Sequence, residues 1–353
     1  MSKKDKIQNK KNLGQFYTTR QEYILNGMMI PNNIENIIEP FCGNGDLLVF
    51  IEKTDRKFNI ECYDIDPKKE FIIKRDTINN PPDYNNKFLI TNPPYLARNK
   101  SKSKILFDKY DVNDLYKCVI KELLTNKCLG GIFIIPLNFW SSIRCADIQL
   151  RKLFLEKYYI ILLNIFEEKV FDDTSYTICS FQFQLRNNNN DNKLNIVIYP
   201  SKNRITTELN KDNNYIIGGT IYNLPLKHKY NITRLTKKNK DKQNTNILVK
   251  CIDDNDTNKI GLSFVNDKDV YVDNTPNQTA RTYASLVIEP SIDHNIQKDL
   301  VKKFNKYLND HRLKFNSLFL TNYRESKDIA RKRISFDLVY NVVEYILDNL
   351  SSI

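Results

Sequence analysis

The sequence predicts an α/β protein with a doubly wound, mostly parallel sheet that closes with an antiparallel hairpin, followed by a smaller α+β domain. Short β-rich runs alternate with helix-length amphipathic segments over residues 34–183. The last two runs have no helix-length connector between them, and the alternation stops at an Asn-rich polar tract, residues 186–193. Strand–helix–strand repetition is typical of parallel sheets, whereas a short connector joins antiparallel strands.

Six runs have the length and composition of buried strands. In chain order they are NIIEPF, KFNIECYDID, KFLITNPPY, GGIFIIPLNF, YYIILLNIF and SYTICSFQF. The segment DVNDLYKCVIKELLTNKCLGG carries apolar residues at 115, 119, 120, 123 and 124, which is the spacing of one helix face. Because this segment ends in Gly130 and Gly131, it is predicted to be a helix with a glycine stop.

Residues 186–353 change in pattern and are predicted to form the second domain. Two pieces, YIIGGTIY and DVYVDN, resemble short strands, and two longer segments, IQKDLVKKFNKYLNDH and ISFDLVYNVVEYILDNL, have helical spacing. The formal net charge of +12 lies mainly in this half, which carries +8 against +4 for residues 1–185. This excess indicates a polyanionic partner, although an AT-rich genome would also enrich lysine.

The bulk composition favours a soluble protein of the cytoplasm. The 353 residues are 41% hydrophobic, enough for one large domain or two ordinary ones. The basic N-terminal start lacks an apolar core, and no stretch reaches the roughly 18 apolar residues of a membrane span. The seven cysteines are scattered without a Cys-x-x-Cys pair, and the three histidines lack ligand spacing, so we expect neither disulfides nor a metal.

A glycine turn and an acidic strand end indicate a ligand site. In EPFCGNG, Gly43 and Gly45 let the backbone pass close to a ligand where the first strand turns toward a helix. Asp64, in YDIDP at the end of the next strand, could accept hydrogen bonds from ribose hydroxyls. Glu39 would repel a pyrophosphate, so a cationic, adenosine-containing ligand fits better than a dinucleotide. An ordinary tight turn is the alternative.

The motifs also occur in a characteristic order. They are LGQFYTT (13–19), EPFCGNG (39–45), YDIDP (63–67), RDTI (75–78), NPPY (92–95), DLYKCVIKELL…GGIFIIP (114–136) and VFDDTSYTICSFQF (170–183). This set resembles the gamma-class DNA adenine-N6 methyltransferases of restriction–modification systems. The resemblance implies a seven-stranded Rossmann-like catalytic domain over residues 13–185, after a basic arm (1–12). It also implies a target-recognition domain over residues 186–353.

The resemblance implies S-adenosylmethionine as the cofactor. Phe16, Tyr17 and Thr18 would cover it, with Thr18 near its carboxylate. Glu39 would lie close to its methionine amino group.

The same resemblance assigns the residues around the adenosine part of the cofactor. Gly43 and Gly45 would let the cofactor approach the backbone, and Asp64 would hold the ribose. Ile65 would pack on the adenine ring, and Asp76 would accept a hydrogen bond from the cofactor's amino group.

The NPPY motif would carry the chemistry, with Asn92 also bordering the cofactor. An exocyclic adenine amine is a poor nucleophile, because its lone pair is delocalised into the ring. The Asn92 side-chain oxygen and the Pro93 carbonyl could accept its N–H bonds, while Pro93 and Pro94 fix the backbone and offer no competing N–H. Base flipping costs roughly a few kcal/mol, and stacking on Tyr95, worth about 1–3 kcal/mol, would offset part of it. By the same resemblance, Phe171 would touch the other face of the base. A rigid strand-end turn with a core tyrosine is the alternative for NPPY, and an ordinary core phenylalanine is the alternative for Phe171.

Two basic stretches are predicted to contact DNA phosphates. The predicted contacts are Arg98, Lys100, Lys102, Lys104, Arg331, Lys332 and Arg333. Solvated surface is the alternative for both stretches. The expected partner is double-stranded DNA, bound by a monomer, with any cognate restriction endonuclease acting separately.

Three other functions remain open at the level of sequence. NPPY also occurs in protein-glutamine methyltransferases and, in related forms, in ribosomal RNA adenine methyltransferases. The large basic second half disfavours a protein substrate, and RNA remains an alternative. A catalytically silent DNA-binding module is the third alternative, and the intact NPPY and EPFCGNG motifs count against it.

Overall fold

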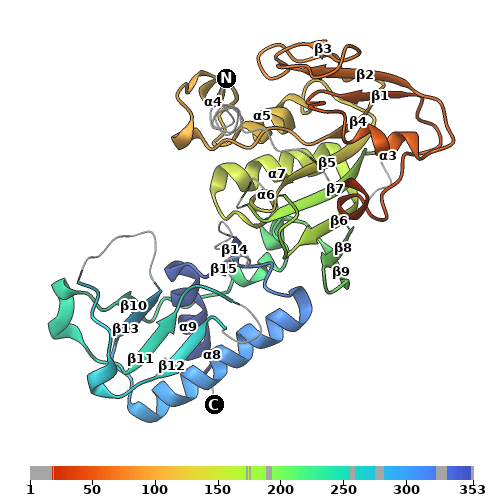
Figure 1. Ribbon diagram of the computed structural model, residues 1–353. Coiled ribbons are helices and arrows are strands. Elements are labelled where there is room, and N and C mark those ends of the chain that lie inside the picture. The colour runs from red at the N-terminus through yellow and green to blue at the C-terminus, as the bar shows by residue number, and fades with distance from the viewer. Residues whose placement is uncertain are drawn as a thin grey trace. The chain divides into compact units, whose positions relative to one another are not determined.

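The computed structural model describes residues 18, 20–171, 174, 176–187, 193–254, 259–274, 282–322 and 332–350. The predicted site residues Phe16, Tyr17 and Arg331, and the predicted basic arm, lie outside these described residues. The chain divides into two compact units, the first running essentially to Leu209 and the second beginning at Asn210 (Figure 1).

The first unit contains a nine-stranded sheet with the strand order β3-β2-β1-β4-β5-β7-β6-β8-β9. Its strands are β1 (Asn36–Glu39), β2 (Asn59–Asp64), β3 (Ile73–Lys74), β4 (Phe88–Thr91), β5 (Gly130–Pro136), β6 (Tyr158–Phe166), β7 (Ile178–Leu185), β8 (Lys193–Tyr199) and β9 (Asn203–Glu208). The pairs from β3 through β5 are parallel, and β7 is antiparallel to both β5 and β6. The predicted fold class, a mostly parallel doubly wound sheet with an antiparallel hairpin, is confirmed.

All six runs predicted as strands form strands of this sheet. They are recognisable because central strands of a parallel sheet are covered on both faces and therefore read as continuous apolar runs. In β5 every residue is buried. Its Phe133 packs against Phe181 and Phe183 of β7, with ring centroids 5.6 and 5.4 Å away.

The sheet has two more strands than the predicted seven. β8 pairs in parallel with β6, and β9 pairs antiparallel with β8. The boundary predicted at residue 186 therefore falls inside the first unit, which continues to Leu209. An Asn-rich composition suits a connection between strands as well as a linker between domains, so sequence could not separate the two.

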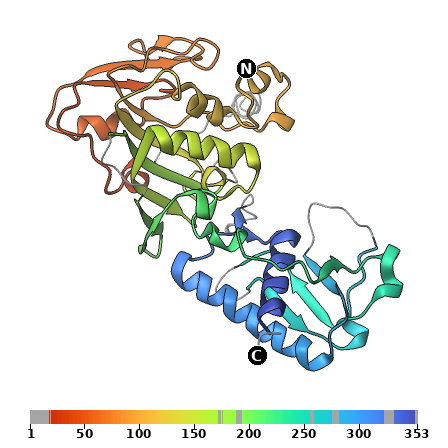
Figure 2. The ribbon, with the colours of Figure 1, turned by 180° about the vertical axis from the view of Figure 1, so that it is seen from behind.

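Helices connect the strands, and Figure 2 shows α7 lying along the sheet of the first unit. The helices are α2 (Gln21–Ile24), α3 (Leu48–Glu52), η1 (Arg98–Lys100), α4 (Ile105–Tyr110), α5 (Leu115–Glu122), α6 (Asn138–Ser141) and α7 (Cys145–Lys157). The glycine stop predicted for α5 is wrong, because Gly130 and Gly131 begin β5. A Cβ at Gly131 would lie 2.3 Å from the Leu89 carbonyl oxygen, so the close approach of β4 requires glycine there.

The second unit is an α+β domain, as predicted. An antiparallel sheet, with the order β10-β13-β11-β12, is accompanied by the two predicted helices. Its elements are η2 (Lys211–Asn213), η3 (Gly219–Tyr222), β10 (Asn231–Arg234), η4 (Lys237–Lys242), β11 (Ile247–Lys250), β12 (Gly261–Phe264), η5 (Asp267–Asp269), β13 (Tyr283–Glu289), α8 (His294–Phe315), β14 (Thr321–Asn322), β15 (Lys332–Arg333) and α9 (Phe336–Leu350). The buried faces of α8 and α9 share one core with the sheet.

The two short pieces predicted as strands in this half are not strands. YIIGGTIY contains the 3-10 helix η3, preceded by Gly218 in the left-handed region at φ +68°. DVYVDN begins at Asp269, the last residue of η5, and among the described residues it forms a single β-bridge, Thr236 to Asp273. Neither piece pairs with another described strand in a β-ladder. A high β-propensity alone does not make a segment a strand when no neighbouring strand pairs with it. Across the described residues, no helix combines the length and apolar character needed to cross a membrane.

Candidate active site

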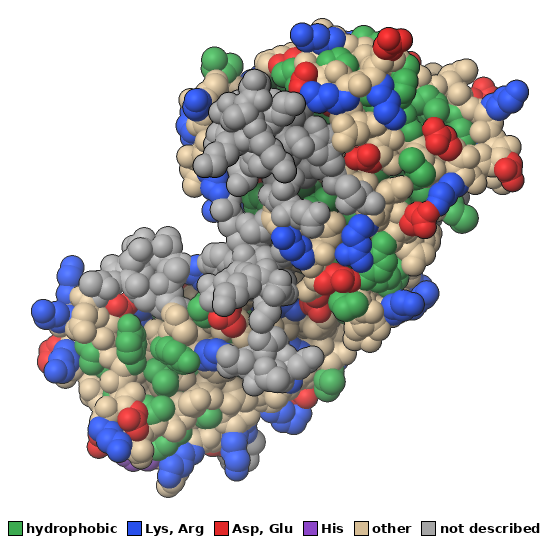
Figure 3. All heavy atoms as spheres, in the orientation of Figure 1, with side chains coloured by type: hydrophobic (Ala, Val, Ile, Leu, Met, Phe, Trp, Pro, Cys, Tyr) green, Lys and Arg blue, Asp and Glu red, His purple; other side chains and the backbone are tan. Residues whose placement is uncertain are grey.

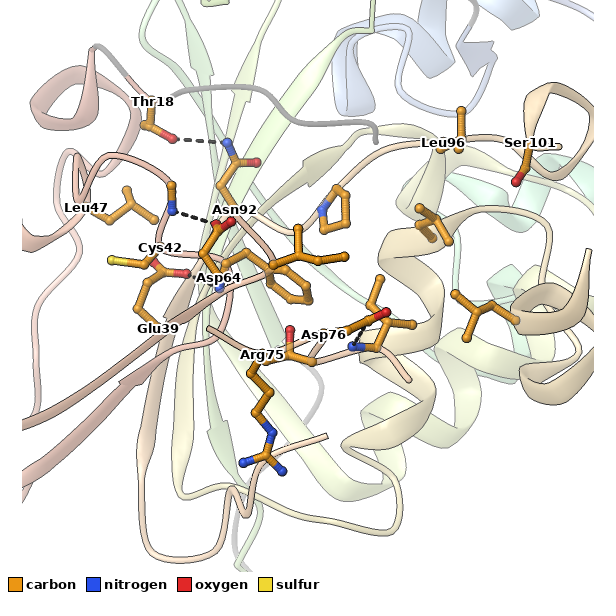
Figure 4. Close-up of a pocket in the computed structure, with 18 of the residues that line it drawn as sticks. Thr18, Glu39, Cys42, Leu47, Asp64, Arg75, Asp76, Asn92, Leu96 and Ser101 are labelled. Atoms are coloured by element: carbon orange, nitrogen blue, oxygen red, sulfur yellow. Dashed lines mark hydrogen bonds between the residues drawn. The ribbon is translucent and has the colours of Figure 1, made fainter. Parts of the chain in front are cut away.

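A cavity of about 240 Å³ lies at the carboxyl ends of β1, β2 and β4 (Figure 4). The chain winds outward from β1 to β2 and β3, then returns to β4 on the other side of β1. Strand order therefore reverses between β1 and β4, which is where open α/β sheets bind ligands. Figure 4 shows Glu39 and Asp64 near one end of the cavity and Ser101 at the other.

Most of the cofactor residues predicted from the motifs meet in this cavity. Its wall includes Thr18, Glu39, Gly43, Asp64, Ile65, Asp76, Asn92 and Pro94. The sequence motifs did not indicate that Ser101 and Ser103, from the basic stretch, also line it, together with Phe107 of α4 and Leu115 of α5. In the part of the chain that the structure describes, no group of three or more His, Cys, Asp or Glu side chains could hold a metal ion.

Glu39 ends β1 and is almost fully buried, with 1% of its surface exposed. Its Oε1 accepts hydrogen bonds from the Phe41 backbone N–H (3.1 Å) and the Thr91 hydroxyl (2.7 Å). Its Oε2 has no hydrogen-bond partner among the described residues. Burial raises the pKa of the Glu39 carboxyl well above its usual range. A buried oxygen without a partner is costly, so a cationic donor entering the cavity would find an acceptor there.

The glycine turn is held by the carboxylate at the end of β2. Gly43 and Gly45 have φ values of +54° and +80°, a region that favours glycine. The Asp64 carboxylate accepts hydrogen bonds from the backbone N–H groups of Gly43 and Asp66, both at 2.8 Å. Ile65, the next residue, is 42% exposed and presents its side chain to the cavity.

Asp76 follows β3 and organises its own loop while lining the cavity. Its carboxylate accepts hydrogen bonds from the Asn79 backbone N–H (3.1 Å) and the Asn79 side chain (2.6 Å). The neighbouring Arg75 backbone N–H donates to the Asp64 carbonyl at 2.9 Å, which ties this loop to β2. Asp64, at the end of β2, and Asp76, in the loop after β3, border the same cavity.

The NPPY turn brings a carboxamide to the same cavity. The Asn92 side chain donates to the Thr18 hydroxyl at 3.1 Å, and its Oδ1 accepts a hydrogen bond from the Tyr95 hydroxyl. The same hydroxyl also lies 2.7 Å from the Ile134 carbonyl oxygen of β5, so these two acceptors compete for its one proton. These contacts hold the turn between the segment before β1 and the centre of the sheet.

Tyr95 and Phe171, which were predicted to contact the target base, do not present open aromatic faces. Tyr95 is 2% exposed, because its hydroxyl reaches β5 and its ring packs in T-shaped contacts with the rings of Tyr116 and Tyr176. The ring centroids of these two residues lie 6.2 and 6.3 Å from that of Tyr95. Phe171 is also buried. In this arrangement neither ring lines the cavity, and stacking with a base requires Tyr95 to become accessible.

The basic stretch after the turn serves partly as cavity wall. Arg98 pairs with Asp108 of α4 at 2.5 Å, and Lys104 donates to the Ser101 carbonyl at 2.5 Å. These two cations thus brace the loop itself. Lys100 and Lys102 are exposed and remain available to a phosphate.

The other predicted DNA-binding cluster is less suitable than its sequence indicated. Lys332 is only 6% exposed, because β15 pairs with β14 and turns this side chain inward. The phosphate contact predicted for Lys332 is therefore not compatible with this conformation, and Arg333 is half-buried. On the face in Figure 3, Lys and Arg side chains of the described residues are spread over both units without forming one continuous patch.

No protein-family model matches the chain, and no curated protein matches its sequence. Among solved structures, part of the chain matches a type I restriction–modification methyltransferase subunit from Streptococcus thermophilus, with 15% identity and a TM-score of 0.39 over 52% of this chain and 47% of that one. The type IIL restriction–modification enzyme MmeI in complex with DNA has 13% identity and a TM-score of 0.39, over 69% of this chain and 43% of that one. The chain spans about half the length of such proteins or less.

Proposed function

We propose that this protein transfers a methyl group from S-adenosylmethionine to the N6 amine of adenine in double-stranded DNA, as the modification enzyme of a restriction–modification system. One observation carries the proposal. The Asn92 carboxamide, at the end of β4, borders the same cavity as the unpartnered Glu39 oxygen and the Asp64 carboxylate. An amine-activating turn thus adjoins a site suited to a cationic, adenosine-containing ligand.

The residues present fit S-adenosylmethionine. Glu39 Oε2 would accept from its ammonium group, and Asp64, oriented by two backbone N–H groups, would accept from ribose hydroxyls. Ile65 offers an exposed apolar surface to the adenine ring, and Asp76 offers a carboxylate to the adenine amine. When bound, this cofactor supplies an electrophilic methyl group on a sulfonium.

The Asn92–Tyr95 turn would hold the accepting amine. The Asn92 Oδ1 and the Pro93 carbonyl would accept its two N–H bonds, which weakens conjugation with the ring and turns the lone pair toward the methyl group. Pro93 and Pro94 contribute no N–H that could compete for those acceptors. The Tyr95 hydroxyl, which donates to Asn92 Oδ1 in this structure, would turn to the Ile134 carbonyl when the amine binds. As the methyl–nitrogen bond forms, the methyl–sulfur bond would break to leave a neutral thioether, and the methylated amine would release one proton to water. Positioning and electrostatics supply the catalysis, and no covalent enzyme intermediate is needed.

The target base must leave the duplex to reach this turn. Flipping costs roughly a few kcal/mol. Tyr95 and Phe171, which are buried in this structure, would contact the base only after moving. Lys100 and Lys102, on the loop that follows the turn, would contact the backbone of the DNA, and the second unit would select the sequence.

The test is methyl transfer from labelled S-adenosylmethionine, with duplex DNA, RNA and protein offered separately. Digestion of the methylated DNA should release N6-methylated deoxyadenosine. Asn92→Ala should lower kcat by about 100- to 1,000-fold, the usual effect of removing one group that stabilises developing charge. Cofactor affinity should stay within several-fold.

Asn85→Ala is the matched control, since Asn85 is an exposed residue just before β4 and lies outside the cavity wall. It should retain the wild-type rate. If RNA alone becomes labelled, the substrate is RNA and the proposal of a DNA substrate is refuted. A wild-type rate for Asn92→Ala would refute the amine activation.

A further inference from the structure

A buried group of charged side chains lies beside the NPPY turn. Asp114, Lys117 and Asp147 are all at most 8% exposed, and in the described part of the chain none of them lines the cavity. Lys117 Nζ lies 2.5 Å from Asp147 Oδ1 and 2.8 Å from Asn113 Oδ1. This pair joins α5 to α7. Three buried charges are expensive, so their presence calls for a structural or catalytic reason.

The chain leaving the NPPY turn is fastened to the start of α5. The Asp114 carboxylate accepts a hydrogen bond from the Leu96 backbone N–H at 3.0 Å. Leu115 N–H donates to the Leu96 carbonyl at 3.2 Å, and Arg98 N–H donates to the Asn113 carbonyl at 2.9 Å. Leu96 directly follows Tyr95. One end of the turn is therefore continuous with β4, and the other end is held by Asp114.

We propose that Asp114 is a positioning residue, whose carboxylate holds the Asn92–Tyr95 turn through the Leu96 N–H in the geometry that methyl transfer requires. This inference rests on the proposed function. A displacement of about 1 Å at a reacting group can cost about 100-fold in rate. Asp114 touches neither of the proposed ligands, so its effect would reach the chemistry through the turn.

The environment of Asp114 makes this anchor sensitive to pH. Burial raises the pKa of the Asp114 carboxyl to about 7, against the lowering effect of Lys117 and the hydrogen bonds from Leu96 and Leu115. An ionised carboxylate accepts a backbone hydrogen bond more strongly than a neutral acid does. The anchor is therefore strongest above neutral pH and weakens as the pH falls. The titratable groups that face it are Lys117, Tyr116 and Cys118 on α5, Asp147 on α7, and Tyr95 and Tyr176.

The test compares the pH profile of kcat for the wild type, Asp114→Asn and Asp111→Asn. Asparagine has the size of aspartate and cannot ionise in this range. Asp111 is an exposed residue between α4 and α5, so its variant is a matched control. The wild-type and Asp111→Asn rates should rise with pH to a plateau, with an inflection near the pKa of Asp114. Asp114→Asn should lose that inflection, and its kcat on the plateau should be about tenfold lower. Its affinity for S-adenosylmethionine should stay within about twofold.

Several outcomes would overturn the inference. They are a wild-type kcat in Asp114→Asn, an inflection that persists in it, or an activity loss fully explained by weaker cofactor binding. If Asp114→Asn does not fold, Asp114→Glu can be measured instead, because it keeps the carboxyl group. Asp114→Glu should keep the inflection and have a lower kcat. A wild-type kcat that does not change with pH would refute the inference. A wild-type protein that methylates no DNA would refute the proposed function instead.

Discussion

Replacing Glu39 by glutamine tests the cofactor site most directly. Glutamine keeps one oxygen to accept from the Phe41 N–H and the Thr91 hydroxyl, so the end of β1 should stay intact. It replaces the unpartnered Oε2 by an N–H₂ group. This group is a hydrogen-bond donor, so it cannot accept a hydrogen bond from the ammonium group of the ligand. A hydrogen bond to a charged group is worth about 1.5–3 kcal/mol. Since each 1.4 kcal/mol is tenfold, Kd for S-adenosylmethionine should rise about 10- to 150-fold.

Glu39→Gln should also change the protons released on binding. Burial raises the pKa of Glu39, so the free protein keeps this carboxyl protonated to a higher pH than usual. A cationic ligand favours the ionised form, so binding should release a proton and affinity should rise with pH. Calorimetry in two buffers of different ionisation enthalpy measures that release. It should disappear in Glu39→Gln and persist in Glu70→Gln, a control on an exposed residue. Equal affinity and equal proton release in wild type and Glu39→Gln would refute this placement of the ammonium group.

Two further predictions concern stability and DNA. Lys117→Met removes the ion-pair partner 2.5 Å from the buried Asp147 carboxylate and leaves Arg151 as a cationic neighbour, so the free energy of unfolding in denaturant should fall by about 1.5–3 kcal/mol. Lys109→Met, on an exposed lysine, should change it by less than about 0.5 kcal/mol, and similar losses in both would contradict the argument. Replacing Lys100 and Lys102 by alanine should weaken binding to all duplexes and reduce the slope of log K against log salt by about 0.9 for each lost contact. An unchanged slope would mean that these two lysines do not contact DNA phosphates and are ordinary solvent-exposed side chains.

The strands of the first unit and the loops that border its cavity were predictable because their signals are local. A strand covered on both faces is an apolar run in any context, and the motifs EPFCGNG, YDIDP and NPPY each follow such a run. Carboxyl ends of parallel strands meet at one edge, so the sequence order alone predicts that Glu39, Asp64 and Asn92 lie close together. The cavity at this edge contains all three.

Features that depend on contacts between distant segments were decided only by the tertiary structure. The local sequence predicts that Gly130 and Gly131 end a helix. In the structure they begin β5, and the close approach of Leu89 in β4 explains why glycine is needed at Gly131. Local sequence suggests that Tyr95 and Lys332 are exposed. In the structure both are buried, Tyr95 by the segments that pack on the NPPY turn and Lys332 by the pairing of β15 with β14. Asp114 resembles an ordinary helix-start residue, and its contact with Leu96 exists only because the turn folds back onto α5. Propensity and periodicity report how a segment is covered, whereas burial of a single side chain depends on which other segment covers it.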